Sequence, residues 1–114
     1  MPDINSILDN LVFSLKASNP YRVVLFGSYA HGNPDENSDL DLMVILDNHH
    51  VSKTYEERLN KKMFVRNLVL EMNRKISIDI LVYSKEELNI LKRNGNCFIE
   101  DIEKTGKILY ELTL

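Results

Sequence analysis

The sequence predicts a small α/β (α+β) domain, with helices packed mainly on one face of a short mixed β-sheet. Three features predict it: short β-rich apolar runs alternate with amphipathic helical segments, capping sequences precede two of those helices, and glycines follow several elements. With 114 residues, the chain is expected to form a single domain over residues 1–114. That length allows a real core but no separate substrate-binding half.

The first half of the chain reads as a helix followed by two strands. Apolar residues recur at helical spacing from residue 4 to 15, Asp3 is placed to cap them, and Asn19-Pro20 ends the helix. Residues 21–26, YRVVLF, are a buried strand that stops at Gly27. A short helix is expected to start at Ser28 to Tyr29, and residues 39–46, DLDLMVIL, form the second strand.

The second half begins with a capping box, TYEE at 54–57, which opens a long helix to about Lys75. Residues 77–83 are the third strand, and a second capping box, SKEE at 84–87, opens a short helix that Gly95 ends. A last helix runs from about Cys97 to Lys104, and residues 107–112 form an extended or irregular tail. The apolar residues of the long helix are expected in the core: Tyr55, Leu59, Met63, Phe64, Leu68 and Met72.

Composition excludes several classes of protein. The net charge is −3, which gives no support to an extended nucleic-acid surface. No long apolar segment or signal pattern predicts a membrane, so a cytoplasmic location is expected. The single cysteine, Cys97, is expected to be a small half-buried hydrophobe.

Three aspartates carry the strongest chemical signal. Asp39 and Asp41 alternate with apolar residues, so both side chains leave the same face of a strand, and Asp79 repeats the pattern in the third strand. If these strands are neighbours, three carboxylates converge. At 4 Å each pair repels by about 4 kcal/mol at an effective dielectric near 20. Carboxylate oxygens suit Mg²⁺, and two such ions would offset the charge.

A Gly-Ser pair supplies the other half of a nucleotide site. Gly27 allows the backbone to approach a phosphate closely, and Ser28 offers a hydroxyl donor. Gly32, Asn33 and Pro34 then turn the chain back toward the aspartates.

The pattern G-S-x(10)-D-x-D, from Gly27-Ser28 to Asp39 and Asp41, with Asp79 in a later strand, resembles the nucleotidyltransferase superfamily of the DNA polymerase β type. The likeness is to its minimal single-domain (MNT) form and covers almost the whole chain. It implies that Gly27 and Ser28 bind the triphosphate, that Asp39 and Asp41 ligate Mg²⁺, and that Asp79 completes the second metal site and helps activate the attacking hydroxyl.

The roles of three further residues are left open by the sequence. His31 stands where members of this group often carry arginine, which leaves phosphate contact there undecided. Lys62 and Arg66, four residues apart on the long helix, either face the triphosphate or are solvated surface charges.

The resemblance leads to a first hypothesis: a Mg²⁺-dependent enzyme that transfers AMP from ATP to a hydroxyl presented by another protein. In that family setting the acceptor is a tyrosine of a HEPN-domain ribonuclease toxin, and the small protein is its antitoxin. One alternative is a non-catalytic module that neutralises its partner by occlusion. Another is a nucleotidyltransferase acting on a small molecule. The base preference, the number of AMP groups and a homo- or hetero-oligomeric state are not determined.

Overall fold

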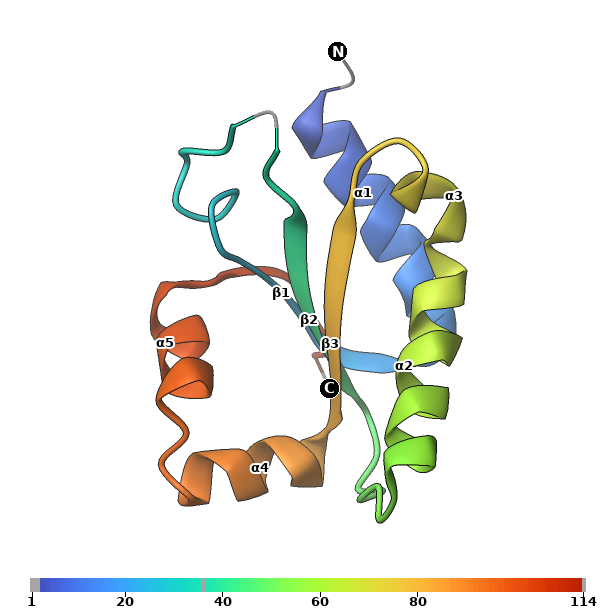
Figure 1. The fold of residues 1–114 in the computed structure, drawn as a ribbon, viewed down its shortest axis with the longest axis vertical. Helices are drawn as coiled ribbons and strands as arrows, with labels where there is room; N and C mark the ends of the chain where they lie inside the picture. Colours follow the sequence, from blue (N-terminus) through green and yellow to red (C-terminus); the bar gives the residue numbers. More distant parts are fainter. Residues whose placement is uncertain (1–2, 36, 114) are drawn as a thin grey trace.

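The computed structural model describes residues 3–35 and 37–113 and contains a four-stranded mixed sheet in the order β3-β2-β1-β4 (Figure 1). β1 pairs antiparallel with both β2 and β4, whereas β2 and β3 are parallel neighbours. Parallel neighbours need a crossover, and the helical segment between them provides it. The strands are β1 (Pro20–Phe26), β2 (Leu40–Leu46), β3 (Ile78–Ser84) and β4 (Lys107–Glu111).

The helices begin where the sequence provides capping groups. Asp3 caps α1, and the two predicted capping boxes, at Thr54 and Ser84, are both formed. Each cap satisfies backbone N–H groups that the first helical turn leaves without partners. The helices are α1 (Ile4–Leu15, continued by the 3₁₀ turn η1, Lys16–Ser18), α2 (Tyr55–Leu68), α3 (Leu70–Asn73), α4 (Lys85–Arg93) and α5 (Cys97–Thr105). In the described ranges, no helix is long and apolar enough to cross a membrane.

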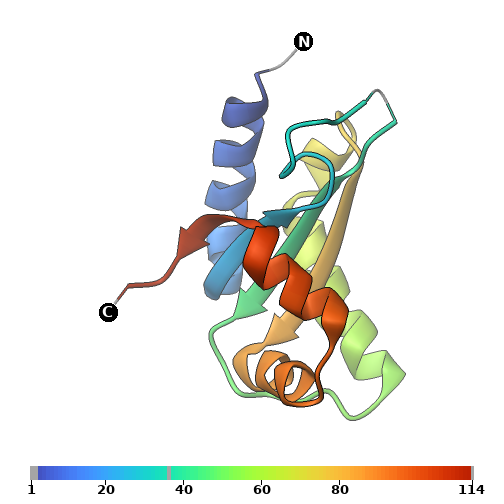
Figure 2. The same cartoon turned by 90° about the vertical axis from the view of Figure 1, so that its left-hand side faces the viewer.

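The sheet is covered on both faces. α1, α2 and α3 form the main helical layer on one face, as expected, while α4 and α5 cover part of the other (Figures 1 and 2). The larger core cluster takes alternate residues of β2, including Leu40, Leu42 and Val44, against α1 and α2. The smaller cluster takes Met43 and Ile45 against α4 and α5. The predicted alternation of β2 is therefore confirmed.

Two element boundaries differ from the sequence prediction. The tail is a regular strand: β4 pairs antiparallel with β1 through Val23↔Tyr110 and Val24↔Ile108. β4 pairs with the backbone N–H and C=O groups along the edge of β1 that does not face β2. The long helix is not continuous to Lys75, because Val69 leaves helical geometry (φ −115°, ψ 17°) and separates α2 from the short α3.

The predicted burial of two side-chain groups is wrong. Tyr55, Leu59, Met63 and Phe64 are exposed by 75%, 41%, 36% and 52%, because the smaller Val65 fills the inward position of α2. Leu68 and Met72 are half-buried, and Met72 packs against the larger core cluster. Cys97 is exposed rather than half-buried, since it lies at the first position of α5.

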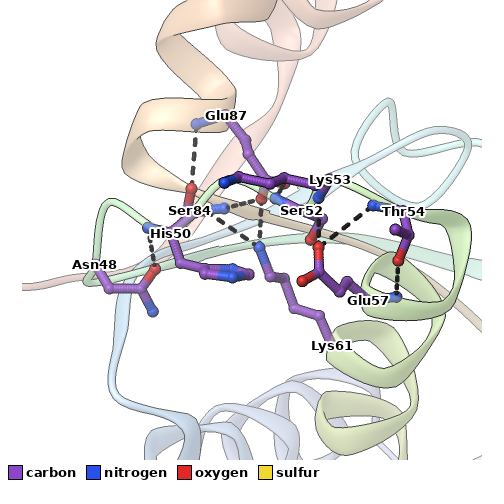
Figure 3. Close-up of polar contacts among 9 residues, drawn as sticks. All are labelled: Asn48, His50, Ser52, Lys53, Thr54, Glu57, Lys61, Ser84 and Glu87. Carbon is purple, nitrogen blue, oxygen red and sulfur yellow. Dashed lines mark hydrogen bonds and ion pairs between the residues drawn. The ribbon is translucent and has the colours of Figure 1, made fainter.

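A partly buried ion pair joins α2 to the start of α4 (Figure 3). Lys61 Nζ lies 2.7 Å from Glu87 Oε1, and the two side chains are only 10% and 13% exposed. The Glu87 carboxylate also accepts hydrogen bonds from the backbone N–H groups of Ser84 and Ser52, at 2.8 and 3.0 Å. Lys61 donates further to the carbonyl of His50. The pair therefore fixes the loop after β2 against both helices.

We expect Glu87→Gln to destabilise the protein by about 2–3 kcal/mol, because the substitution leaves the Lys61 ammonium buried without a counter-charge. Urea unfolding at pH 7 measures this loss. Glu86→Gln is the matched control: Glu86 pairs with Arg93 at the surface, so its loss should cost less than about 1 kcal/mol. Equal losses for the two variants would contradict the buried role of Glu87.

The pH dependence of this effect follows from the pKa of Glu87. Burial opposes ionisation, but hydrogen bonds from Lys61 and the backbone of Ser52 and Ser84 outweigh it and lower the pKa of Glu87 from 4.5 to about 2. A depressed carboxyl pKa stabilises the fold above the unfolded value and loses that contribution as pH falls through the folded one. The stability difference between wild type and Glu87→Gln should therefore shrink between pH 4.5 and about 2.

Candidate active site

The carboxylates of Asp41 and Asp79 lie side by side at one end of the sheet. The two residues are direct register partners in the parallel β2–β3 pair, so their side chains leave the same face of adjacent strands. On β2 that is the face of Met43 and Ile45, which α4 and α5 cover farther along the strand. Asp41 is half-buried and Asp79 is exposed. The strand pairing thus brings together two of the three predicted aspartates.

Asp39 lies just before β2 and is exposed. Its charge still reaches the pair, because burial first, then the charge of Asp79 and then that of Asp39 raise the pKa of Asp41 above its ordinary value of 3.8. In the described ranges, none of the three carboxylates is in an ion pair with a lysine or arginine. The end of the sheet therefore carries concentrated negative charge.

The donor set fits Mg²⁺ that is bound together with a phosphate. Among the described residues, no group of three or more His, Cys, Asp or Glu side chains is arranged closely enough to hold a metal ion by itself. Mg²⁺ is usually held by one or two carboxylates plus substrate phosphates rather than by an all-protein cage. The Asp41–Asp79 pair, with Asp39 beside it, supplies oxygen donors of that kind.

Gly27 packs directly against Asp41. Phe26, the last residue of β1, is the register partner of Asp41, and Gly27 follows it with φ +75°. A Cβ atom placed on Gly27 would lie 2.2 Å from Asp41 Oδ2 and 3.1 Å from its Cγ. Both the backbone conformation and the close carboxylate therefore require glycine at this position.

Ser28 is half-buried in a tight turn, so the predicted short helix at Ser28 to Tyr29 is wrong. The N–H groups of Ala30 and His31 both donate to the carbonyl of Gly27, which closes a single turn that does not continue. The chain instead turns back toward β2, because Gly32 adopts φ +79° and Pro34 follows it.

Two cavities lie on the α1 and α2 side of the sheet, opposite to the face that the Asp41 and Asp79 side chains leave, and each has one of the aspartates in its lining. Asp39 lines the larger one, of about 710 Å³, together with Tyr29 and the apolar side chains of Ile7 and Ile76. Asp79 lines the smaller one, of about 260 Å³, with residues of α2 that include Lys62 and Arg66. Among the described residues, the two cavities share no lining residue. The larger volume is within the range of small-molecule sites.

The other candidate side chains lie at different places in the fold. His31 is exposed in the turn. Tyr29 is partly buried and packs against the larger core cluster. His49 and His50 are exposed in the loop after β2, and in the described part of the chain they belong to no metal-binding group.

The comparison with protein families decides the classification. The family described as polymerase beta, nucleotidyltransferase matches residues 10–113, which include all five predicted site residues. The chain belongs to this family. It is thus a nucleotidyltransferase, as the sequence pattern implied.

One named relative and two solved structures resemble this chain. The chain is 31% identical over 111 residues to "Putative protein adenylyltransferase MJ1305" of Methanocaldococcus jannaschii, covering 95% of this chain and 72% of that protein. A toxin-antitoxin crystal structure with AMP-PNP shares the fold at TM-score 0.61 and 17% identity, over 93% of this chain and 74% of that chain. The tri-AMPylated Shewanella oneidensis HEPN toxin in complex with MNT antitoxin matches at TM-score 0.58 and 14% identity, over 95% and 72%.

Apart from Asp39, sequence reasoning did not single out these residues of the larger cavity. Ile4 and Ile7 come from α1, Ser38 precedes β2, and Lys75 and Ile76 precede β3. Each reads locally as an ordinary core or turn residue, so no local signal marks it. Lys62 and Arg66 did carry a signal, the spacing of four residues on one helix, and both line the cavity that contains Asp79.

Proposed function

We propose that the protein transfers AMP from ATP to a hydroxyl group of a partner protein. The observation that carries this proposal is the placement of Asp41, in register with Asp79 and packed against Gly27. Family membership supports the reaction class, and the relative named as a protein adenylyltransferase supports AMP and a protein acceptor.

In this proposal, Asp39, Asp41 and Asp79 hold Mg²⁺, two ions when ATP is bound, and Gly27 and Ser28 contact the phosphates. Mg²⁺, when bound, stabilises negative charge on the transferring phosphate and the departing pyrophosphate. Asp79, the most accessible member of the register pair, also lies beside the incoming hydroxyl and helps to accept its proton. The side chains otherwise act by alignment, because phosphoryl chemistry depends mainly on positioning and electrostatics.

We propose a HEPN-domain toxin as the partner. The support is the fold likeness to an MNT antitoxin in complex with a tri-AMPylated HEPN toxin and to a toxin-antitoxin structure with AMP-PNP. The protein would then be an antitoxin that modifies a tyrosine of the toxin. The proposal includes a cytoplasmic location, since ATP is a cytoplasmic substrate.

The test uses ATP labelled at the α-phosphate, Mg²⁺ and the product of the adjacent reading frame, which the proposal expects to be a HEPN-domain protein. We expect label to appear on the HEPN-domain protein, with a mass increase of one or more AMP groups, and Asp39→Ala to lower the rate about 100-fold. Removal of Mg²⁺ by EDTA should have a similar effect.

Three outcomes separate the candidate functions. No label transfer by the wild type would overturn adenylylation. Toxin neutralisation that persists in the Asp39→Ala variant without label would favour occlusion by a binding module. Label on a small hydroxyl compound, but none on the HEPN-domain protein, would favour a small-molecule transferase.

A further inference from the structure

Two phenylalanine rings lie beside the carboxylates, on the same face of the sheet. Phe26 is the register partner of Asp41 on β1, as Asp79 is on β3, so these three side chains form one row across the strands. Phe26 also packs with the core cluster of that face. The ring of Phe98, from α5, is nearly perpendicular to the ring of Phe26, at 86°, and the two ring centroids are 5.8 Å apart.

Phe98 is exposed although its helix is closely packed. α5 packs on β1 and buries Ile99 and Ile102 (Figure 2), while Phe98 keeps 55% of its surface exposed. A Cβ atom on Gly106, the residue that ends α5, would lie 2.6 Å from Val24 Cγ1, so the helix lies very close to the strand. The Phe98 ring is therefore held in place by Phe26 and by a fixed helix, and the rest of its surface is open to a ligand.

The proposed reaction directs the nucleoside away from the row of side chains. The attacking and leaving oxygens lie in line on opposite sides of the α-phosphorus. In the proposed function the hydroxyl lies beside Asp79, and Gly27 and Ser28, which follow β1, contact the departing phosphates. This line therefore runs along the row, across the strands. The ribose oxygen is bonded to the phosphorus beside the line, so the nucleoside extends either past the end of the sheet or along its face toward α5.

The aromatic surface lies in the second of these directions. Tyr29, the aromatic residue of the turn past the end of the sheet, packs against the core cluster of the opposite face. Tyr21 and Tyr83 share the face of the carboxylates, but they belong to the other ends of β1 and β3. Every nucleobase has a π-face that stacks on aromatic side chains. The exposed ring of Phe98 offers such a surface next to the row.

We propose that Phe98 stacks against the adenine base of ATP and that Phe26 holds the Phe98 ring in position. This inference rests on the proposed function and adds to it the subsite for the base. The acceptor is the weaker occupant of this surface, because its hydroxyl approaches from the Asp79 side, at the opposite end of the row from Phe26. A purine offers a larger ring to stack than a pyrimidine, so Phe98 also favours ATP over UTP.

The test measures the affinity of the full chain for ATP with Mg²⁺, by isothermal titration without an acceptor. We expect Phe98→Ala to bind ATP about tenfold more weakly, because it removes the stacking surface. Phe98→Trp should keep the wild-type affinity, since it keeps an aromatic face. Phe64→Ala is the matched control: Phe64 is exposed by 52%, but it belongs to α2 on the other face of the sheet, so ATP affinity should not change.

A second probe separates base stacking from support of the phosphate turn. Inorganic tripolyphosphate has no base, so Phe98→Ala should bind it with Mg²⁺ as tightly as the wild type does. The wild type should bind ATP more tightly than UTP, and Phe98→Ala should narrow this difference. The thermal midpoint without ligand should fall little, because Phe98 is more than half exposed. If alanine lowers the midpoint strongly, Phe98→Leu, which keeps an apolar side chain without a π-face, replaces it in both titrations.

Four outcomes decide the inference. Equal ATP affinity in wild type and Phe98→Ala would overturn it and leave the proposed function intact. An equal loss of affinity for ATP and tripolyphosphate would also overturn it, since Phe98 would then support the phosphate turn. A wild type that binds no ATP would overturn both the inference and the proposed function. A selective loss of ATP affinity in Phe98→Ala, without AMP transfer by the wild type, would support the base subsite and contradict adenylylation.

Discussion

Asp41→Asn is expected to abolish nucleotidyl transfer without destabilising the fold. Asp41 is the central carboxylate: Asp79 is its register partner, and the charges of both Asp79 and Asp39 act on it. The substitution removes the charged carboxylate, and with it the strongest proposed metal ligand, from the position between the other two aspartates. The rate should therefore fall by about 100-fold or more. The isosteric amide also removes a partly buried charge and two repulsions, so stability should stay equal or rise.

Two measurements check this expectation. Transfer from labelled ATP gives the rate, and thermal unfolding gives the stability with and without Mg²⁺. The wild type should gain stability from Mg²⁺ and ATP, and the variant should gain much less, because only the native state binds them. Asp9→Asn, an exposed substitution on α1, should match the wild type in both assays. A variant that remains active would remove Asp41 from the site, and one that unfolds would make its role structural.

Gly27→Ala is expected to lower both stability and activity. The positive φ of +75° costs an alanine about 1–2 kcal/mol. The new Cβ would also lie 2.2 Å from Asp41 Oδ2, so the carboxylate has to move away from its position beside Asp79. We expect a total loss of about 2–4 kcal/mol and transfer reduced at least about tenfold.

Gly32→Ala separates the two causes. Gly32 has a similar φ of +79°, but a Cβ there meets no atom within 4 Å. It should therefore show the conformational cost alone, about 1–2 kcal/mol in urea unfolding, with little effect on the rate. If Gly27→Ala loses no more stability than Gly32→Ala and keeps its activity, the contact between Gly27 and Asp41 does not define the site.

Much of the site could be predicted because it depends on local periodicity. A strand directs every second side chain to the same face, so the positions of Asp39 and Asp41 among leucines already indicated a charged face opposite the core. The capping boxes at Thr54 and Ser84 are local in the same way, and both are formed. The turn at Ser28 was predicted less well, because one hydrogen-bonded turn and a helix start have similar sequences.

The apolar residues of α2 show where periodicity fails. Tyr55, Leu59 and Met63 have helical spacing, but α2 is apolar on more than one side and only one side can face the sheet. Small Val65 and Val69 fit that side, and they leave the larger residues outside. The pattern predicts that an apolar side will be covered, and it does not specify whether the cover is the chain's own core or another protein.

By itself, the sequence determined the first three strands, the caps and the two charged positions around Leu40, because each follows from interactions between residues close along the chain. Only the tertiary structure decided that Asp79 lies beside Asp41 and that β4 completes the sheet. These depend on contacts between segments far apart in sequence. Such contacts are selected by packing and strand pairing over the whole fold, and no local pattern specifies them.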